Sequence, residues 1–124
     1  HRSEAVDESF WIEIDTLKVG ILRNPYERVI HLYKESWDWI GLEKWIERTT
    51  ITSQLELSKE CDVVVCLESW EDDFKSLGIT PDKNSMNKLC KHYSEDYRRW
   101  YSQNLKTLVR PIVVQDLTTF GYRF

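Results

Sequence analysis

The stretch that decides the fold reads Lys18-Val-Gly-Ile-Leu-Arg-Asn-Pro-Tyr-Glu-Arg-Val-Ile-His-Leu-Tyr33. Residues 17–22 are apolar apart from one Lys and one Gly, which is typical of a short strand buried between two layers. A helix then begins sharply, because Asn24 is a favoured N-cap, Pro25 fits the first helical position and Glu27 can bond back to the cap. The stretch therefore predicts a strand that ends at Arg23 and runs directly into a helix.

The predicted helix separates two sets of side chains when it is drawn at about 100° per residue. The apolar set consists of Tyr26, Val29, Ile30, Tyr33, Trp37 and Ile40. Asn24, Arg28 and His31 fall on the opposite side, so we expect the helix to hold them away from its buried face. Arg23 reaches the positive N-terminal end, where free backbone N–H groups favour a phosphate or sulfate. Because Arg can bind such an anion through two hydrogen bonds, we predict an anion site at Arg23, Asn24 and His31.

A family resemblance rests on this stretch. Arg-Asn-Pro-Tyr-Glu-Arg at residues 23–28, followed by Val-Ile-His-Leu-Tyr at 29–33, resembles the 3′-phosphate-binding motif of sulfotransferases that use 3′-phosphoadenosine 5′-phosphosulfate (PAPS). In that motif an Arg ends a strand and a Ser lies on the following helix. Arg23 matches the Arg, whereas His31 stands where the Ser is usual. The resemblance implies that Arg23, Asn24 and His31 bind the sulfonucleotide.

A second strand and a short helix continue the resemblance. Residues 61–67 contain three consecutive valines and predict another buried strand, so the chain should form a β-α-β unit with a right-handed crossover. Glu68 follows, and Ser69 should cap a helix over residues 70–76 that Gly78 closes. The family has a similar strand, Glu and short helix. We expect Glu68 to orient Arg28 or a backbone group.

The C-terminal third is predicted to be helical from Tyr97, with a kink or a new segment at Pro111 and an end at Gly121. Residues 116–124 carry Asp and then Phe-Gly-Tyr-x-Phe, which resembles the helix that docks under the sheet at the end of sulfotransferases. The resemblance thus covers residues 17–124. It implies an α/β fold with a parallel sheet flanked by helices, in the P-loop NTPase-like architecture of sulfotransferases, within a single domain over residues 1–124.

The family's Lys-bearing loop that cradles the 5′-phosphosulfate normally precedes this region, and the catalytic base commonly lies there as well. No stretch of the 124 residues matches that loop, and no residue inherits the base by motif. The first residues show no helix cap and no targeting pattern. We therefore expect the chain to be the C-terminal part of a longer domain.

The resemblance implies transfer of a sulfuryl group from PAPS to a hydroxyl-bearing acceptor, with positioning and electrostatic stabilisation doing most of the catalysis. Two alternatives stay open. One is a catalytically inert sulfotransferase-like interaction domain whose partner surface contains Trp37, Trp39 and Trp45. The other is a kinase-like nucleotide enzyme, which needs a phosphate loop and a Mg²⁺ carboxylate. Arg23 held in an internal carboxylate pair, at a helix start closed to solvent, would argue against the anion site.

Composition narrows the class of protein. The chain is 41% hydrophobic, with six Trp and six Tyr, which is typical of a globular protein. No apolar run approaches about 18 residues, so we expect no membrane segment. The net charge of −4 and the lack of a recognised motif disfavour nucleic-acid binding. Lys and Arg outnumber Asp and Glu in residues 83–110. This basic segment forms either solvated helix faces or a surface that binds an anionic ligand.

The three cysteines, Cys61, Cys66 and Cys90, show neither a CxxC pair nor metal-ligand spacing. They suit reduced thiols in a reducing compartment such as the cytoplasm, and we predict no metal site. The remaining expectations concern shorter segments: Gly41 ends the first helix, residues 42–48 form a second one, and residues 49–58 and 80–87 are loops. In the family the latter loop approaches the nucleotide, which makes Asn84, Ser85 and Lys88 secondary contacts. Residues 9–14 fit a strand or a helix end equally well.

Overall fold

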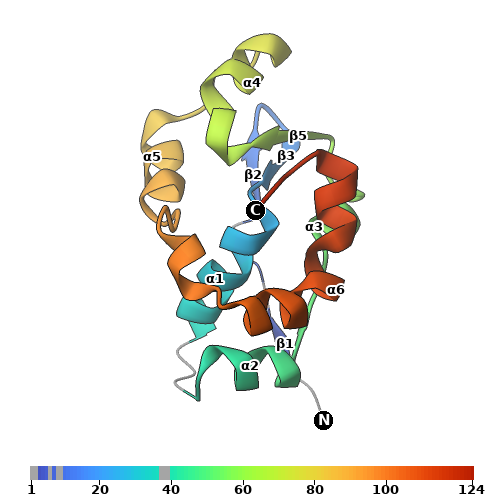
Figure 1. Cartoon of the computed structure of the whole chain (residues 1–124). Coiled ribbons are helices and arrows are strands. Elements are labelled where there is room, and N and C mark those ends of the chain that lie inside the picture. Colours follow the sequence, from blue (N-terminus) through green and yellow to red (C-terminus); the bar gives the residue numbers. More distant parts are fainter. Residues whose placement is uncertain (1–2, 6, 8–9, 37–39) are drawn as a thin grey trace.

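Two small sheets carry the fold in the computed structural model, which describes residues 3–5, 7, 10–36 and 40–124 (Figure 1). The larger sheet contains β2 (Trp11–Ile14), β3 (Leu17–Leu22) and β5 (Val63–Cys66) in the order β2-β3-β5. β3 and β5 are parallel, and Gly20 lies opposite Val64. The smaller sheet pairs β1 (Ser3–Ala5) in parallel with β4 (Thr49–Ile51). The coarse α/β class and the parallel pairing of the two predicted strands are confirmed.

β2 departs from the expected parallel sheet, because it runs antiparallel to β3. The two strands are joined by Asp15 and Thr16, and both residues have positive φ angles, of 50° and 68°. Two such residues form the tight turn that matches the twist of a hairpin. So short a connection cannot carry the crossover that a parallel neighbour needs, so the strand must return antiparallel.

Six α-helices and two short 3-10 helices surround the strands of the described chain. They are α1 (Pro25–Ser36), α2 (Leu42–Arg48), α3 (Gln54–Ser58), α4 (Trp70–Leu77), α5 (Lys83–Lys91) and α6 (Gln103–Phe120), with η1 (Leu67–Ser69) and η2 (Tyr97–Trp100). Figure 1 shows the C-terminus in the middle of the molecule, close to the start of α1 in this view.

The core is divided into two hydrophobic clusters. One joins α1, α2, η2 and α6 and contains Tyr26, Val29, Ile30, Leu32, Trp45, Ile46, Tyr97, Leu105, Val109 and Val113. The other joins β3 and β5 to α4 and α5 through Val19, Ile21, Val65, Leu67, Phe74 and Met86. Burial of these side chains removes apolar surface from water, which is the main stabilising contribution to the fold. The β3–α1 junction therefore lies where the two clusters meet.

α1 is buried on all sides over its first two turns, because every residue from 25 to 32 is buried. The expectation that Asn24, Arg28 and His31 form a stripe away from the core is therefore wrong. Periodicity correctly identified the apolar face, but the polar face is covered too, by groups that hydrogen-bond to it. α1 is described as far as Ser36, and Gly41, with φ 101°, is the N-cap of α2. Whether α1 reaches Gly41 depends on residues 37–39, which lie outside the described residues.

Both predicted loops contain regular structure. Residues 49–58 hold β4 and α3, and Ser53 caps α3 by accepting a hydrogen bond from the Glu56 N–H group at 3.1 Å. Residues 80–87 hold the first turns of α5, since the Asp82 carboxylate accepts from the Asn84 N–H group at 3.0 Å. Asp before a polar run is a signal for a turn and for a helix start alike. The strand β4 depends on a distant partner, so no local pattern reveals it.

The ends of the last helices follow local signals more closely. Gly78 and Gly121 close α4 and α6 in the left-handed conformation, with φ 70° and 73°, as predicted. Ser69 does not cap α4 as expected, because its hydroxyl instead donates to Asp73 at 3.2 Å. α6 begins only at Gln103 and passes through Pro111 as one helix, although Figure 1 shows that its axis changes direction along its length. Proline explains such a bend, since it removes one backbone donor.

Candidate functional site

Arg23 follows β3 directly, at the carboxyl end of the parallel pair, which is where ligand sites of α/β sheets gather. The residue is only 5% exposed, because its side chain folds over the first turn of α1. Its Nε group donates to Glu27 Oε1 at 2.5 Å, and the guanidinium lies 5.8 Å from the centre of the Tyr93 ring. Nη2 is buried without a hydrogen-bond partner among the described residues. Arg23 is therefore held in an internal carboxylate pair at a helix start that is closed to solvent, which argues against the anion site predicted there, although Nη2 keeps no partner among the described residues.

Glu27 is fully buried and neutralises much of the charge on Arg23. Its Oε2 accepts a hydrogen bond from the Ser94 N–H group at 3.1 Å, while Oε1 faces Arg23. Burial raises the pKa of Glu27 above its ordinary value, and the positive charge of Arg23 opposes that shift. Glu27 thus accepts hydrogen bonds from Arg23 and from the Ser94 backbone. The predicted bond from Glu27 back to the helix cap is wrong.

Asn24 caps α1 as predicted. Its Oδ1 accepts from the Tyr26 N–H group at 3.0 Å, which satisfies one of the free donors at the helix start. Its Nδ2 donates to the Arg123 carbonyl at 2.7 Å, so the C-terminal segment packs against the helix start. Asn24 is 7% exposed and is engaged at both ends of its amide.

Glu68, in η1 directly after β5, bonds to the start of α1. Its Oε2 accepts from the Asn24 backbone N–H group at 2.8 Å, and its Oε1 accepts from the Tyr122 hydroxyl at 2.7 Å. The expectation that Glu68 orients a backbone group is confirmed. The carboxylate occupies the position at the helix N-terminus where the dipole favours negative charge.

Arg28 has different partners from those expected. Its Nε donates to Asp7 Oδ2 at 2.8 Å, and its Nη1 donates to the Thr52 carbonyl at 2.8 Å. Both side chains of the Arg28–Asp7 pair are nearly inaccessible to solvent. Arg28 therefore ties α1 to the chain near β1 and β4, and no hydrogen bond links it to Glu68 in the described structure.

His31 is neutral at physiological pH. Its Nδ1 lies 3.2 Å from the His92 carbonyl, and because a carbonyl oxygen only accepts, Nδ1 carries the proton. Burial, assisted by the charge of Arg23, lowers the pKa of His31 to about 4. In this arrangement Nε2 is a hydrogen-bond acceptor, so His31 presents neither a positive charge nor a donor to an anion. The usual Ser of the resembled motif would present a donor.

The lowered pKa of His31 predicts acid sensitivity. The unfolded chain binds more protons between the ordinary pKa of 6.5 and the folded value of about 4. Stability is therefore complete above the unfolded value and is lost as the pH falls, by about 2 kcal/mol between pH 7 and pH 5 from this residue. His31→Asn keeps a nitrogen near the His92 carbonyl without titrating. Urea unfolding at both pH values should show a loss about 2 kcal/mol smaller in the variant, and equal losses would contradict the assignment.

A cavity of about 330 Å³ is lined by Leu67, Glu68, Trp70, Cys90, Tyr93 and Glu95, so none of the predicted site residues Arg23, Asn24 and His31 lines it. Two of these residues connect it to the predicted site, because Glu68 holds the Asn24 N–H group and Tyr93 packs on the Arg23 guanidinium. Tyr93 was not predicted as a site residue. Its place depends on how α5 returns to the sheet, and no motif around it signals that.

The other predicted contacts lie elsewhere. Asn84 and Ser85 belong to α5 and hydrogen-bond to Asp82, and neither they nor Lys88 line the cavity beside Glu68. Trp45 is 4% exposed and belongs to the core, which removes it from the predicted partner surface. Trp37 and Trp39 lie outside the described residues. The three cysteines are free thiols.

Comparisons add no family to this geometry. No protein-family model, no curated protein and no solved structure matches the chain. Among residues 3–5, 7, 10–36 and 40–124, no group of three or more His, Cys, Asp or Glu side chains is arranged to hold a metal ion. A search of the same residues for a helix long and apolar enough to cross a membrane finds none.

Proposed function

We propose that this chain is the 3′-phosphate-binding part of a sulfotransferase that transfers the sulfuryl group of PAPS to a hydroxyl-bearing acceptor. The observation that carries the proposal is the buried Nη2 group of Arg23, which has no partner among the described residues. A buried donor without an acceptor costs about 1–3 kcal/mol. A phosphate oxygen at this position recovers that free energy, and native proteins rarely leave such a group unsatisfied.

The surroundings of Arg23 support the same role. The residue joins a strand of the parallel pair to the N-terminus of a long helix, which is a favourable position for an anion. Asn24 caps the first turn of α1, and two residues that line the cavity, Glu68 and Tyr93, contact Asn24 and Arg23 respectively. The order of motifs from residue 17 to residue 124 is that of the resembled family.

Within this proposal the chain binds and orients one end of the co-substrate. Arg23 Nη2 donates to the 3′-phosphate while Nε stays on Glu27, so the contact is a single charged hydrogen bond in place of a bidentate one. Such a bond contributes about 1.5–3 kcal/mol. PAPS supplies the sulfuryl group, and positioning it in line with the acceptor hydroxyl is the main catalytic requirement. His31 is a neutral neighbour of this phosphate.

The proposal predicts a preference for 3′-phosphoadenosine 5′-phosphate over AMP, measured by isothermal titration calorimetry. Arg23→Lys keeps a positive charge beside Glu27 but lacks Nη2, so the preference should fall at least about tenfold. Arg28→Lys is the matched control, because it makes the same change at a second buried Arg of α1 that bonds to Asp7 and Thr52. A preference that survives Arg23→Lys would remove Arg23 from the site.

A catalytically inert interaction domain is the second candidate. It is favoured by the internal pairing of the site, since Arg23 Nε bonds to Glu27 and the Asn24 N–H group bonds to Glu68. The Arg23 side chain and the Asn24 N–H group thus each already have a carboxylate partner within the fold. A full-length protein that binds neither nucleotide would favour this candidate, whereas magnesium-dependent binding of ATP would favour the kinase-like alternative.

A further inference from the structure

We propose that Glu68 is an internal competitor for the anion site at the start of α1, and that a phosphate or sulfate binds there by displacing its carboxylate. The inference rests on the proposed function, because the competing anion is taken to be the 3′-phosphate of the nucleotide. Removing the Glu68 charge should therefore raise the affinity for the anion, whereas removing a residue that binds the anion would lower it.

The contacts of Glu68 are those of an anion bound at a helix N-terminus. Its carboxylate accepts hydrogen bonds from the Asn24 backbone N–H group at 2.8 Å and from the Tyr122 hydroxyl at 2.7 Å. These two donors come from opposite ends of the described chain. A phosphate at this helix start uses the same backbone donor. Glu68 therefore fills a place that the ligand needs.

Glu68 is free to leave that place, whereas Glu27 is not. Glu27 is fully buried between Arg23 and Ser94, so moving it would uncover a buried charge. Glu68 is exposed and lines the cavity of about 330 Å³, so its carboxylate can turn toward solvent and keep its hydration. Displacement uncovers the Asn24 N–H group next to Arg23.

Arg23 is the second, independent indication of an anion at this place. It is 5% exposed, immediately precedes the cap residue of α1, and keeps Nη2 without a partner in the described chain. A carboxylate on one side and an unsatisfied guanidinium nitrogen on the other leave the helix start incompletely paired. Nη2 makes no hydrogen bond to the Glu68 carboxylate, so the inference requires that an anion larger than a carboxylate, accepting from the Asn24 N–H group, extends to Arg23 Nη2.

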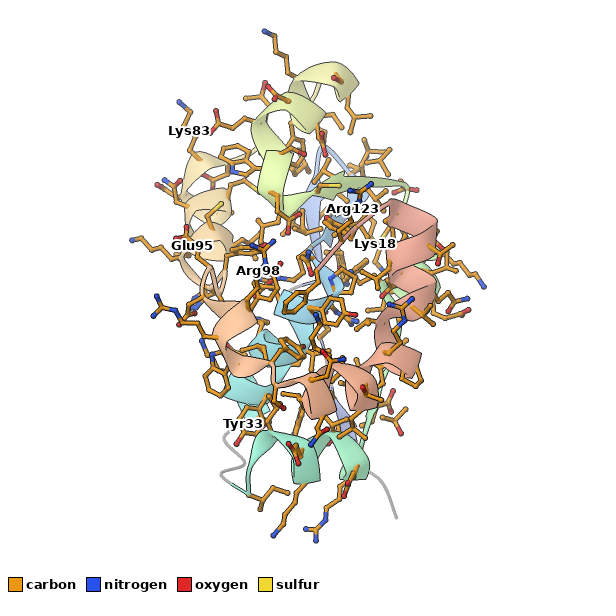
Figure 2. The ribbon with its side chains drawn as sticks, in the orientation of Figure 1. Lys18, Tyr33, Lys83, Glu95, Arg98 and Arg123 are labelled. Atoms are coloured by element: carbon orange, nitrogen blue, oxygen red, sulfur yellow. The ribbon has the colours of Figure 1, made fainter. Side chains whose placement is uncertain are left out.

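Inorganic sulfate is the probe, titrated at constant ionic strength while the Asn24 amide is followed by ¹H–¹⁵N NMR. Glu68→Gln removes the competing charge with little change of shape, and the dissociation constant for sulfate should fall about tenfold because sulfate no longer displaces a carboxylate from the Asn24 N–H group. Glu95→Gln is the matched control, since Glu95 lines the same cavity and no hydrogen bond joins it to the helix start in the described part of the chain. It should change the constant less than about twofold. Glu95 is labelled in Figure 2.

An unchanged sulfate affinity in Glu68→Gln overturns the inference, and so does an equal gain in Glu95→Gln, which would reflect net charge alone. Glu68→Ala is a second uncharged variant and should also bind sulfate more tightly. It keeps the inference testable if the amide introduced by Glu68→Gln distorts the helix start. The nucleotides separate this result from the proposed function. Tighter sulfate binding with equal affinities for 3′-phosphoadenosine 5′-phosphate and AMP supports the competitor and rejects the sulfonucleotide site, whereas a 3′-phosphate preference with no effect of Glu68→Gln does the reverse.

Discussion

Glu27→Ala is expected to lower the free energy of unfolding by about 3–5 kcal/mol, because it leaves the Arg23 guanidinium buried without its carboxylate. Arg23 is 5% exposed and its Nη2 has no partner among the described residues, so the loss of Glu27 would remove the carboxylate that pairs with this buried charge. The Ser94 N–H group would lose its acceptor as well. Urea unfolding at pH 7 measures the loss.

A double-mutant cycle separates the free energy contributed by the Arg23–Glu27 charge interaction from that contributed by packing of the two side chains. Arg23→Met and Glu27→Met each leave one buried charge, whereas the double variant replaces the pair by apolar side chains of similar length. The double variant should be more stable than the sum of the single losses predicts, by at least about 2 kcal/mol. Additive losses would mean that the pair contributes nothing beyond its packing.

Asp116→Ala should lower the free energy of unfolding by about 3 kcal/mol. Asp116 is 2% exposed on α6, and its two carboxylate oxygens accept from the Gln54 N–H group at 2.9 Å and the Leu55 N–H group at 3.0 Å. A hydrogen bond to a charged group contributes about 1.5–3 kcal/mol. Asp82→Ala is the control, because it removes an exposed helix cap and should cost only about 1 kcal/mol. Equal losses would mean that burial adds nothing at Asp116.

The Asp116 variant also tests how the site is held. Gln54, at the start of α3, clamps the main chain of Arg23, since its Oε1 accepts from the Arg23 N–H group at 2.9 Å and its Nε2 donates to the Arg23 carbonyl at 2.8 Å. Asp116 therefore positions Arg23 through Gln54. Backbone amide exchange at Arg23 should increase in Asp116→Ala more than in Asp82→Ala.

The C-terminal segment also holds the start of α1 in place, and its contacts there could be predicted only in part from the sequence. The Phe124 carbonyl accepts from the Tyr97 hydroxyl at 2.5 Å and from Arg98 Nε at 2.8 Å, and the Phe124 ring packs edge-on against Tyr26. Arg98 and Arg123 are labelled in Figure 2. The aromatic residues of this segment are only partly buried, so the expectation that they form core holds in part: Phe124 packs against the cluster of α1, α2, η2 and α6, while the Tyr122 hydroxyl bonds to Glu68.

Short-range signals account for the elements that were predicted well. The strand at residues 17–22, the helix start at Pro25 and the glycine ends of α4 and α6 each depend on residues within about one turn. The sequence also shows that Arg23 and Glu27 stand four residues apart. The strength of the ion pair between them cannot be predicted from the sequence, because it depends on burial by segments distant in the chain.

By itself, the sequence determined where the strand β3 ends, where α1 begins, and that an Arg stands between them at the carboxyl end of a parallel strand pair. Only the tertiary structure decided what surrounds that Arg. Glu27 pairs with its guanidinium, while Glu68 and the C-terminal segment bond to the neighbouring Asn24. Burial of His31 and the charge of Arg23 keep His31 neutral, and one Arg23 nitrogen has no partner among the described residues. Helix caps and strand ends are set by neighbours in the chain, whereas charge state and accessibility are set by neighbours in space.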